Sequence, residues 1–164
     1  MATNPSFAAL EKALDFEREG IEYFTSAINR TSHPVAKAMF ELLIDQEKKH
    51  IDYLSLMYDR LKAEDRWPRD ITIDLDMDFK HIFREAIKNI DETVKVYTDE
   101  IEAVSYAVDL ENRGRKMYRE LSEKATDALE KEFYARLSEW ERGHAEYLED
   151  FYNYFQDKGL FTRE

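Results

Sequence analysis

Residues 40–58 read FELLIDQEKKHIDYLSLMY, and residues 134–152 read YARLSEWERGHAEYLEDFY. Each stretch holds a Glu followed three residues later by a His, with leucine and tyrosine at matching places around the pair. The separation is 134 − 40 = 94 positions, and residues 13–20 (ALDFEREG) resemble residues 107–114 (AVDLENRG) at the same separation. Two segments that share one separation indicate an internal repeat, which we interpret as two helical hairpins.

Helix boundaries agree with this repeat. The chain has only 4 Gly and 3 Pro, the main helix breakers. Asn4-Pro5 predicts a cap and first turn, so the first helix runs to about Arg30. The second starts at Ser32-His33-Pro34 and runs to about Asp65. We expect the third helix over residues 99–124 and the fourth from a Thr126 cap to about Asp157, with Gly159 as its stop.

The two hairpins need a long connection if they run in parallel. Residues 66–76 contain Pro68 and show no helical period, so we predict that they form this crossover. Residues 79–90 predict an extra short helix. The whole chain, residues 1–164, is therefore expected to be one all-α domain, a four-helix bundle of two hairpins with a long crossover and an additional short helix.

Each long helix has an apolar stripe at spacings of three and four residues, and each stripe is interrupted near its middle by carboxylates or imidazoles. The interruptions are Glu17, the Glu47/His50 pair, Glu111 and the Glu141/His144 pair. The third stripe also carries Arg115, between Val108 and Tyr118. Gly20 and Gly114 each follow a stripe glutamate by three residues, where they leave room beside the site or allow close helix packing.

Four carboxylates at one level of a core cannot all ionise without compensation, because burying an unpaired charge is costly. Two divalent cations would balance four carboxylates, and two neutral imidazoles would complete the ligand set. Oxygen and imidazole nitrogen ligands suit iron or manganese, with zinc as a redox-silent substitute. One Glu-x-x-His is a weak signal, but two at matched positions of a repeat, each with a partner Glu, predict a two-metal site.

The order of Glu17, Glu47-Lys-Lys-His50, Glu111 and Glu141-Arg-Gly-His144 on successive helices resembles the rubrerythrin-like branch of the ferritin-like superfamily. The likeness extends over nearly the whole chain and implies a ferritin-like fold with a di-iron centre. It further implies that Glu47 and Glu141 bridge the irons, that Glu17 and Glu111 are terminal ligands, and that His50 and His144 bind one iron each.

The chain departs from the full rubrerythrin pattern. It has no Cys, hence no rubredoxin domain, and an external electron donor is expected, either rubredoxin-like or a flavin reductase. Peroxidase-type members carry a further glutamate where this chain has Val108, which weakens the case for efficient peroxide reduction. Tyr118 could hydrogen-bond a ligand or pass an electron, and it is equally interpretable as a core tyrosine.

By the same resemblance we expect an oxidoreductase that reduces hydrogen peroxide or dioxygen in oxidative-stress defence. Iron handling, by ferroxidase activity and storage, is the main alternative, and a bundle that binds metal without turnover is a third. We also expect a homodimer, since aromatic residues near the end of the fourth helix could form a subunit contact.

Composition limits the remaining classes. A net charge of −12 disfavours nucleic acid binding, which needs Lys and Arg to neutralise phosphates. The absence of Cys rules out disulfides, iron–sulfur clusters and Cys-ligated zinc. Residues 1–10 lack the pattern of a signal peptide, and no segment is apolar enough for a membrane span. We therefore expect a cytoplasmic protein.

Overall fold

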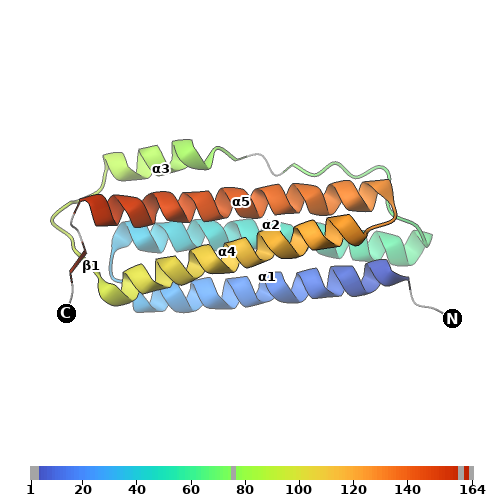
Figure 1. Cartoon of the computed structure of the whole chain (residues 1–164), viewed down its shortest axis with the longest axis horizontal. Helices are drawn as coiled ribbons and strands as arrows, with labels where there is room; N and C mark the ends of the chain where they lie inside the picture. The colour runs from blue at the N-terminus through green and yellow to red at the C-terminus, as the bar shows by residue number, and fades with distance from the viewer. Residues whose placement is uncertain (1–3, 75–76, 159–160, 163–164) are drawn as a thin grey trace.

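Four long helices lie side by side in a computed structural model that describes residues 4–74, 77–158 and 161–162 (Figure 1). They are α1 (Pro5–Arg30), α2 (Pro34–Glu64), α4 (Thr98–Lys124) and α5 (Ala128–Asp157). α1 packs antiparallel on α2, and α4 packs antiparallel on α5. The hairpins meet through α1 with α4 and, less extensively, through α2 with α5. The predicted all-α, ferritin-like bundle is confirmed.

Residues 66–74 of the crossover lie beside the N-terminal part of α5, and the short helix α3 (Phe79–Lys88) covers the C-terminal part of α5 (Figure 1). Trp67 is buried and packs edge-on against Phe133 of α5, which fixes the start of the crossover to the bundle. The short helix ends two residues before the predicted Ile90, because Asn89 forms its C-cap. A parallel pairing of β1 (Val96–Tyr97) with β2 (Phe161–Thr162) was not predicted from the sequence.

One predicted helix cap is confirmed and another is wrong by one residue. The Asn4 side chain accepts a hydrogen bond from the Ser6 amide at 3.0 Å, as predicted. Thr126 is not the cap of α5: the Asp127 side chain accepts from the amides of Leu129 and Glu130 at 2.8 and 3.3 Å. A carboxylate accepts these bonds better than a neutral hydroxyl, because the helix N-terminus favours negative charge.

His33 caps α2 in the same way, and 127 − 33 = 94, so the repeat separation extends to the true caps. The sequence interpretation was one residue early in the second hairpin. The predicted stop at Gly159 lies outside the described residues.

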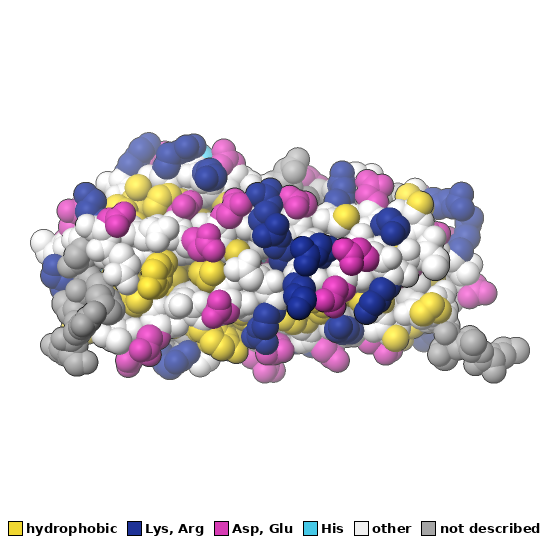
Figure 2. Space-filling view, viewed as in Figure 1, with side chains coloured by type: hydrophobic (Ala, Val, Ile, Leu, Met, Phe, Trp, Pro, Cys, Tyr) yellow, Lys and Arg dark blue, Asp and Glu magenta, His cyan; other side chains and the backbone are white. Residues whose placement is uncertain are grey.

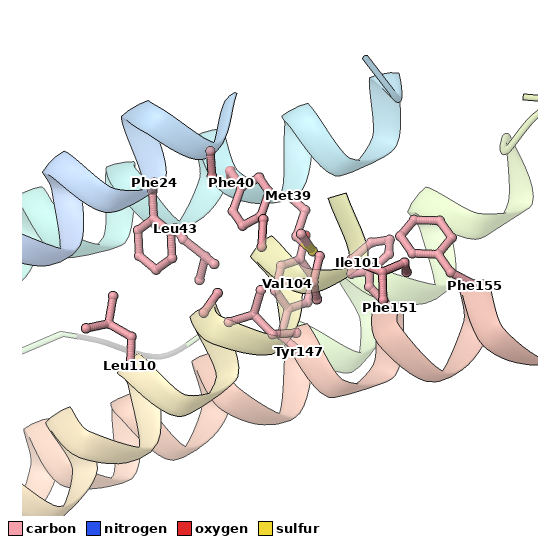
Figure 3. Packing of buried hydrophobic residues seen from close by; sticks show 14 of the residues in the cluster. Phe24, Met39, Phe40, Leu43, Ile101, Val104, Leu110, Tyr147, Phe151 and Phe155 are labelled. Carbon is pink, nitrogen blue, oxygen red and sulfur yellow. The ribbon is translucent and has the colours of Figure 1, made fainter. Parts of the chain in front are cut away.

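The core consists of two apolar clusters with a polar layer between them. Figure 3 shows the first, in which side chains such as Phe24, Phe40, Val104 and Phe151 point towards one another from α1, α2, α4 and α5. The second cluster, towards the other end, includes Leu10, Leu54, Met57 and Leu137. The polar layer therefore has apolar packing on both sides along the bundle axis.

One predicted stripe needs correction. Arg115 is exposed and Val108 is only half-buried, so neither lies on the buried line of α4. In this part of α4 the buried residues are instead Gly114, Met117 and Tyr118. A spacing of strictly three and four residues drifts around a straight helix, and the contact with α5 decides which residues are covered.

Among the described residues, no helix combines the length and the apolar character that a membrane span requires.

The capping result gives a first prediction. Asp127→Ala removes the acceptor for two amides at the start of α5 and should lower the free energy of unfolding by about 1 kcal/mol. Thr126→Ala should change it by a few tenths of a kcal/mol at most, because Thr126 lies outside the cap. Urea unfolding followed by circular dichroism measures both. A larger loss for Thr126→Ala than for Asp127→Ala would contradict the assignment.

Candidate metal centre

Six buried polar side chains meet at the middle of the bundle. Each is at most 3% exposed, and each long helix contributes. The residues are Glu17 from α1, Glu47 and His50 from α2, Glu111 from α4, and Glu141 and His144 from α5. The structure brings together all six residues that the sequence singled out as ligands.

The imidazole Nδ1 atoms lie among the carboxylates. His50 Nδ1 is 3.2 Å from Glu17 Oε1, 3.3 Å from Glu47 Oε2 and 3.1 Å from Glu141 Oε1. His144 Nδ1 is 3.1 Å from both Glu47 Oε1 and Glu111 Oε2, and 3.8 Å from Glu141 Oε2. The two rings are nearly parallel, with centroids 5.3 Å apart.

The ligand atoms fall into two overlapping groups. One atom each from Glu17, Glu47, His50 and Glu141 lie within 4.8 Å of one another, and so do atoms from Glu47, Glu111, Glu141 and His144. Glu47 and Glu141 belong to both groups. Two cations placed in these groups would share the same two carboxylates, which is the arrangement expected of a carboxylate-bridged pair.

The carboxyl pKa values divide the four glutamates into two kinds. Burial, reinforced by the negative charge of Glu47, raises the pKa of Glu17 well above its ordinary value of 4.5. Burial and the charge of Glu141 raise the pKa of Glu111 in the same way. Burial opposes ionisation of Glu47 and Glu141 as well, but hydrogen bonds from Glu17, Glu111 and the imidazoles hold their pKa values below the ordinary value.

The histidines shift towards their charged form. Burial alone would lower the pKa of His50, but the charges of Glu17 and Glu47 outweigh it and raise that pKa well above 6.5. Burial also opposes protonation of His144, whose pKa is raised by Glu111 and by hydrogen bonds to Glu141 and Glu47. Without metal, these shifts favour protonation of the two imidazoles and of Glu17 and Glu111, and ionisation of Glu47 and Glu141.

The donor set fits two divalent cations. Four ionised carboxylates and two such cations sum to −4 + 4 = 0, so two bound cations would displace protons from this cluster without leaving net charge in the core. Buried Glu17 Oε2 has no hydrogen-bond partner among the described residues. Buried polar atoms are almost always hydrogen-bonded, and a bound cation would supply the partner that Glu17 Oε2 lacks.

Tyr118 contacts this centre directly. Its hydroxyl is fully buried and donates a short hydrogen bond to Glu17 Oε1. Burial, reinforced by the charges of Glu17 and Glu141, raises the pKa of the Tyr118 phenol well above its ordinary value, so the hydroxyl keeps its proton at neutral pH. The Tyr118 ring is nearly parallel to that of Tyr134, with centroids 6.2 Å apart.

The two repeat glycines differ in their surroundings. A Cβ on Gly114 would lie 2.7 Å from Phe16 Cε1 and 3.1 Å from Glu141 Oε2, so a side chain there would displace its neighbours. A Cβ on Gly20 would meet nothing closer than Glu47 Cγ, at 3.9 Å. Gly114 therefore allows α4 to approach the centre closely, whereas Gly20 is not required for packing.

Sequence reasoning missed the aromatic residues behind the histidines. The Trp140 ring lies edge-on to His50 and to His144, with centroids 6.1 Å away in each case. Phe79 of α3 lies edge-on to His144 at 5.3 Å. The signal for Trp140 was its place directly before Glu141, where the first hairpin has Gln46. Phe79 had no signal, because its position depends on the path of the crossover.

Comparison with known proteins supports the predicted resemblance. A family model for rubrerythrin matches residues 102–164, a segment that contains Glu111, Glu141 and His144. The chain is thus similar to rubrerythrin over its second hairpin, and the first hairpin lies outside the matched segment. Comparisons with curated proteins and with solved structures gave no match. Together, the family match and the buried Glu/His cluster indicate a metal centre.

The glycine contrast gives a second prediction. Gly114→Ala should lower the free energy of unfolding of the metal-free protein by about 1–3 kcal/mol, because the new methyl group overpacks the contact with Phe16. Gly20→Ala, its repeat partner, should be neutral or stabilising by up to about 1 kcal/mol through helix propensity. Urea midpoints at constant slope measure both. Equal losses would show that the two sites are packed alike.

Proton exchange gives a third prediction. Loading two divalent cations near pH 7 should release protons, because the pKa values of Glu17, Glu111, His50 and His144 are raised in the metal-free cluster and ligands bind metal in their deprotonated forms. Affinity should therefore rise with pH, since protons compete less well at higher pH. A pH-stat titration of metal-free protein with Mn²⁺ measures the release. Two cations bound with almost no proton release would contradict this charge balance.

Proposed function

We propose that this rubrerythrin-like chain holds two iron ions in the Glu/His cluster and reduces hydrogen peroxide or dioxygen with electrons from an external donor. The observation that carries the proposal is that Glu47 and Glu141 belong to both candidate ligand groups. Shared carboxylates would keep the two cations close enough to act together on one molecule of peroxide or dioxygen.

Two ferrous ions would supply two electrons together, the number that reduction of peroxide to two water molecules requires, along with two protons. The protein residues have separate tasks. Glu47 and Glu141 would bridge, and Glu17 and Glu111 would be terminal ligands that accept or give up protons as the charge of the centre changes. His50 and His144 would complete the two sites.

Tyr118 is a positioning residue in this proposal. Its hydroxyl donates to Glu17 Oε1, so it fixes the orientation of one terminal carboxylate and keeps a proton next to the centre. The apolar clusters on both sides exclude bulk water from the polar layer. A dry site strengthens each of these electrostatic interactions.

The absence of Cys supports the need for an external donor. The chain contains no thiolate to ligate an iron–sulfur or rubredoxin-type centre, so a second redox site of that kind is not available within it. Electrons would therefore come from outside residues 1–164, and a rubredoxin-like carrier or a flavin reductase is the proposed class of donor.

The experiment is to load iron under anaerobic conditions, add peroxide, and follow peroxide loss with and without a reducing system. The proposal expects one peroxide consumed per two ferrous ions in a single turnover, and repeated turnover when electrons are supplied. Oxidation that occurs once and never cycles would overturn it. A large hollow assembly that accumulates ferric iron would favour storage instead, and size-exclusion chromatography with light scattering distinguishes that outcome.

A matched pair of tyrosine variants gives a fourth prediction. Tyr118→Phe removes the hydroxyl that contacts Glu17 and should slow peroxide turnover about tenfold or more, with two metal ions still bound. Tyr134→Phe should leave turnover unchanged, because the Tyr134 hydroxyl has no hydrogen-bond partner among the described residues. Metal content and thermal unfolding serve as controls for folding. Equal rates for both variants and the parent would exclude a role for the Tyr118 hydroxyl.

A further inference from the structure

A cationic surface lies on α4 directly outside the metal centre. Residues 112–119 read NRGRKMYR, with four basic residues and no acidic one, in a chain whose net charge is −12. Arg113, Arg115, Lys116 and Arg119 are all exposed, and we call them the cationic band. Figure 2 shows Lys and Arg side chains gathered across the middle of the molecule, where α4 passes.

Most of this charge is not neutralised by the protein. No ion pair joins Arg115, Lys116 or Arg119 to another described residue. Arg113 lies over the Tyr106 ring, 5.9 Å from its centroid, and donates a hydrogen bond to the Tyr106 hydroxyl at 3.3 Å, so its partner is not an acidic group. On the flanking helices, by contrast, Asp15 is paired with Arg18 at 3.2 Å and Glu139 with Arg142 at 2.9 Å. The cationic band is thus available to an external anionic partner.

The band also lies close to the centre. Gly114 lies between Arg113 and Arg115, and a Cβ on it would be 3.1 Å from Glu141 Oε2. Arg115 is held beside α5, since its backbone oxygen accepts a hydrogen bond from Ser138 Oγ at 2.9 Å. Only the thickness of one helix, about 10 Å, therefore separates a molecule bound to the band from the Glu/His cluster.

We propose that the cationic band is the docking surface for an acidic one-electron carrier protein, which delivers electrons to the centre across α4. The need for an electron donor rests on the proposed function. The docking site and the charge of the partner are new. Charge complementarity steers such encounters and speeds association, and it suits a transient complex that must form and dissociate at every turnover.

The test measures binding, not turnover. The probe is an acidic rubredoxin, titrated into the metal-loaded full-length chain by calorimetry at low and at physiological ionic strength. Arg115→Glu with Lys116→Glu should weaken binding about tenfold or more. Binding by the parent should weaken strongly as salt shortens the screening length from about 30 Å to about 8 Å, whereas the variant should respond little.

The matched control is Lys48→Glu with Lys49→Glu. These exposed lysines flank the same level of the centre on α2, diagonally across the bundle from α4, and the change in net charge is identical. At physiological ionic strength this variant should bind the rubredoxin within about twofold of the parent, because exposed charges much further from a contact than about 8 Å are largely screened. Metal content and helicity should match the parent in both variants.

Three results would overturn the proposal. Equal weakening by the two variants would mean that only net charge matters, and equal binding of basic cytochrome c would mean that charge does not select the partner. Dissociation of a dimer by the α4 variant, seen in sedimentation velocity, would assign the band to a second copy of the chain. Failure of peroxide turnover with intact, band-dependent rubredoxin binding would count against the proposed function and not against docking.

Discussion

Charge neutrality in the polar layer is the constraint on which the rest of the structure depends. Four glutamates and two histidines are almost fully buried between two apolar clusters, so the layer tolerates no net charge. Two cations, or four protons, satisfy this condition. The pKa values of Glu17 and His50 are both raised, which favours a neutral carboxyl beside a charged imidazole and so expresses the same requirement.

Another buried carboxylate shows that burial alone does not indicate metal. Glu100 is 3% exposed, yet its oxygens accept hydrogen bonds from the Thr31 hydroxyl and from the amides of Ser32, His33 and Tyr97. These donors lower the pKa of Glu100 against the effect of burial, and the carboxylate is stable as an anion at the start of α2. The central glutamates have no such amide donors, because each lies in the middle of a helix whose amides are already used.

The repeat made both the fold and the cluster predictable. One separation of 94 positions aligned the hairpins, and the interrupted stripes identified all six residues that converge. Side-chain exposure, helix caps and long-range contacts that depend on tertiary packing could not be predicted from the repeat. Arg115 was placed on the buried stripe although α4 turns it outward. Thr126 was predicted as a cap because it lies 94 positions after Ser32, whereas the caps are the next residues along the chain, His33 and Asp127. The contact of Phe79 with His144 depends on the crossover, whose path has no local signal.

The polar layer would hold the metal ions, and Tyr118 would fix the orientation of the ligand Glu17. The cationic band would bind the donor whose electrons reach the centre across α4. The most direct measurement of this account's central claim is anomalous X-ray diffraction at the iron edge from crystals of iron-loaded protein. The account predicts two anomalous peaks, one beside His50 and one beside His144, with Glu47 and Glu141 contacting both. A single peak, or iron bound only at surface carboxylates, would contradict it.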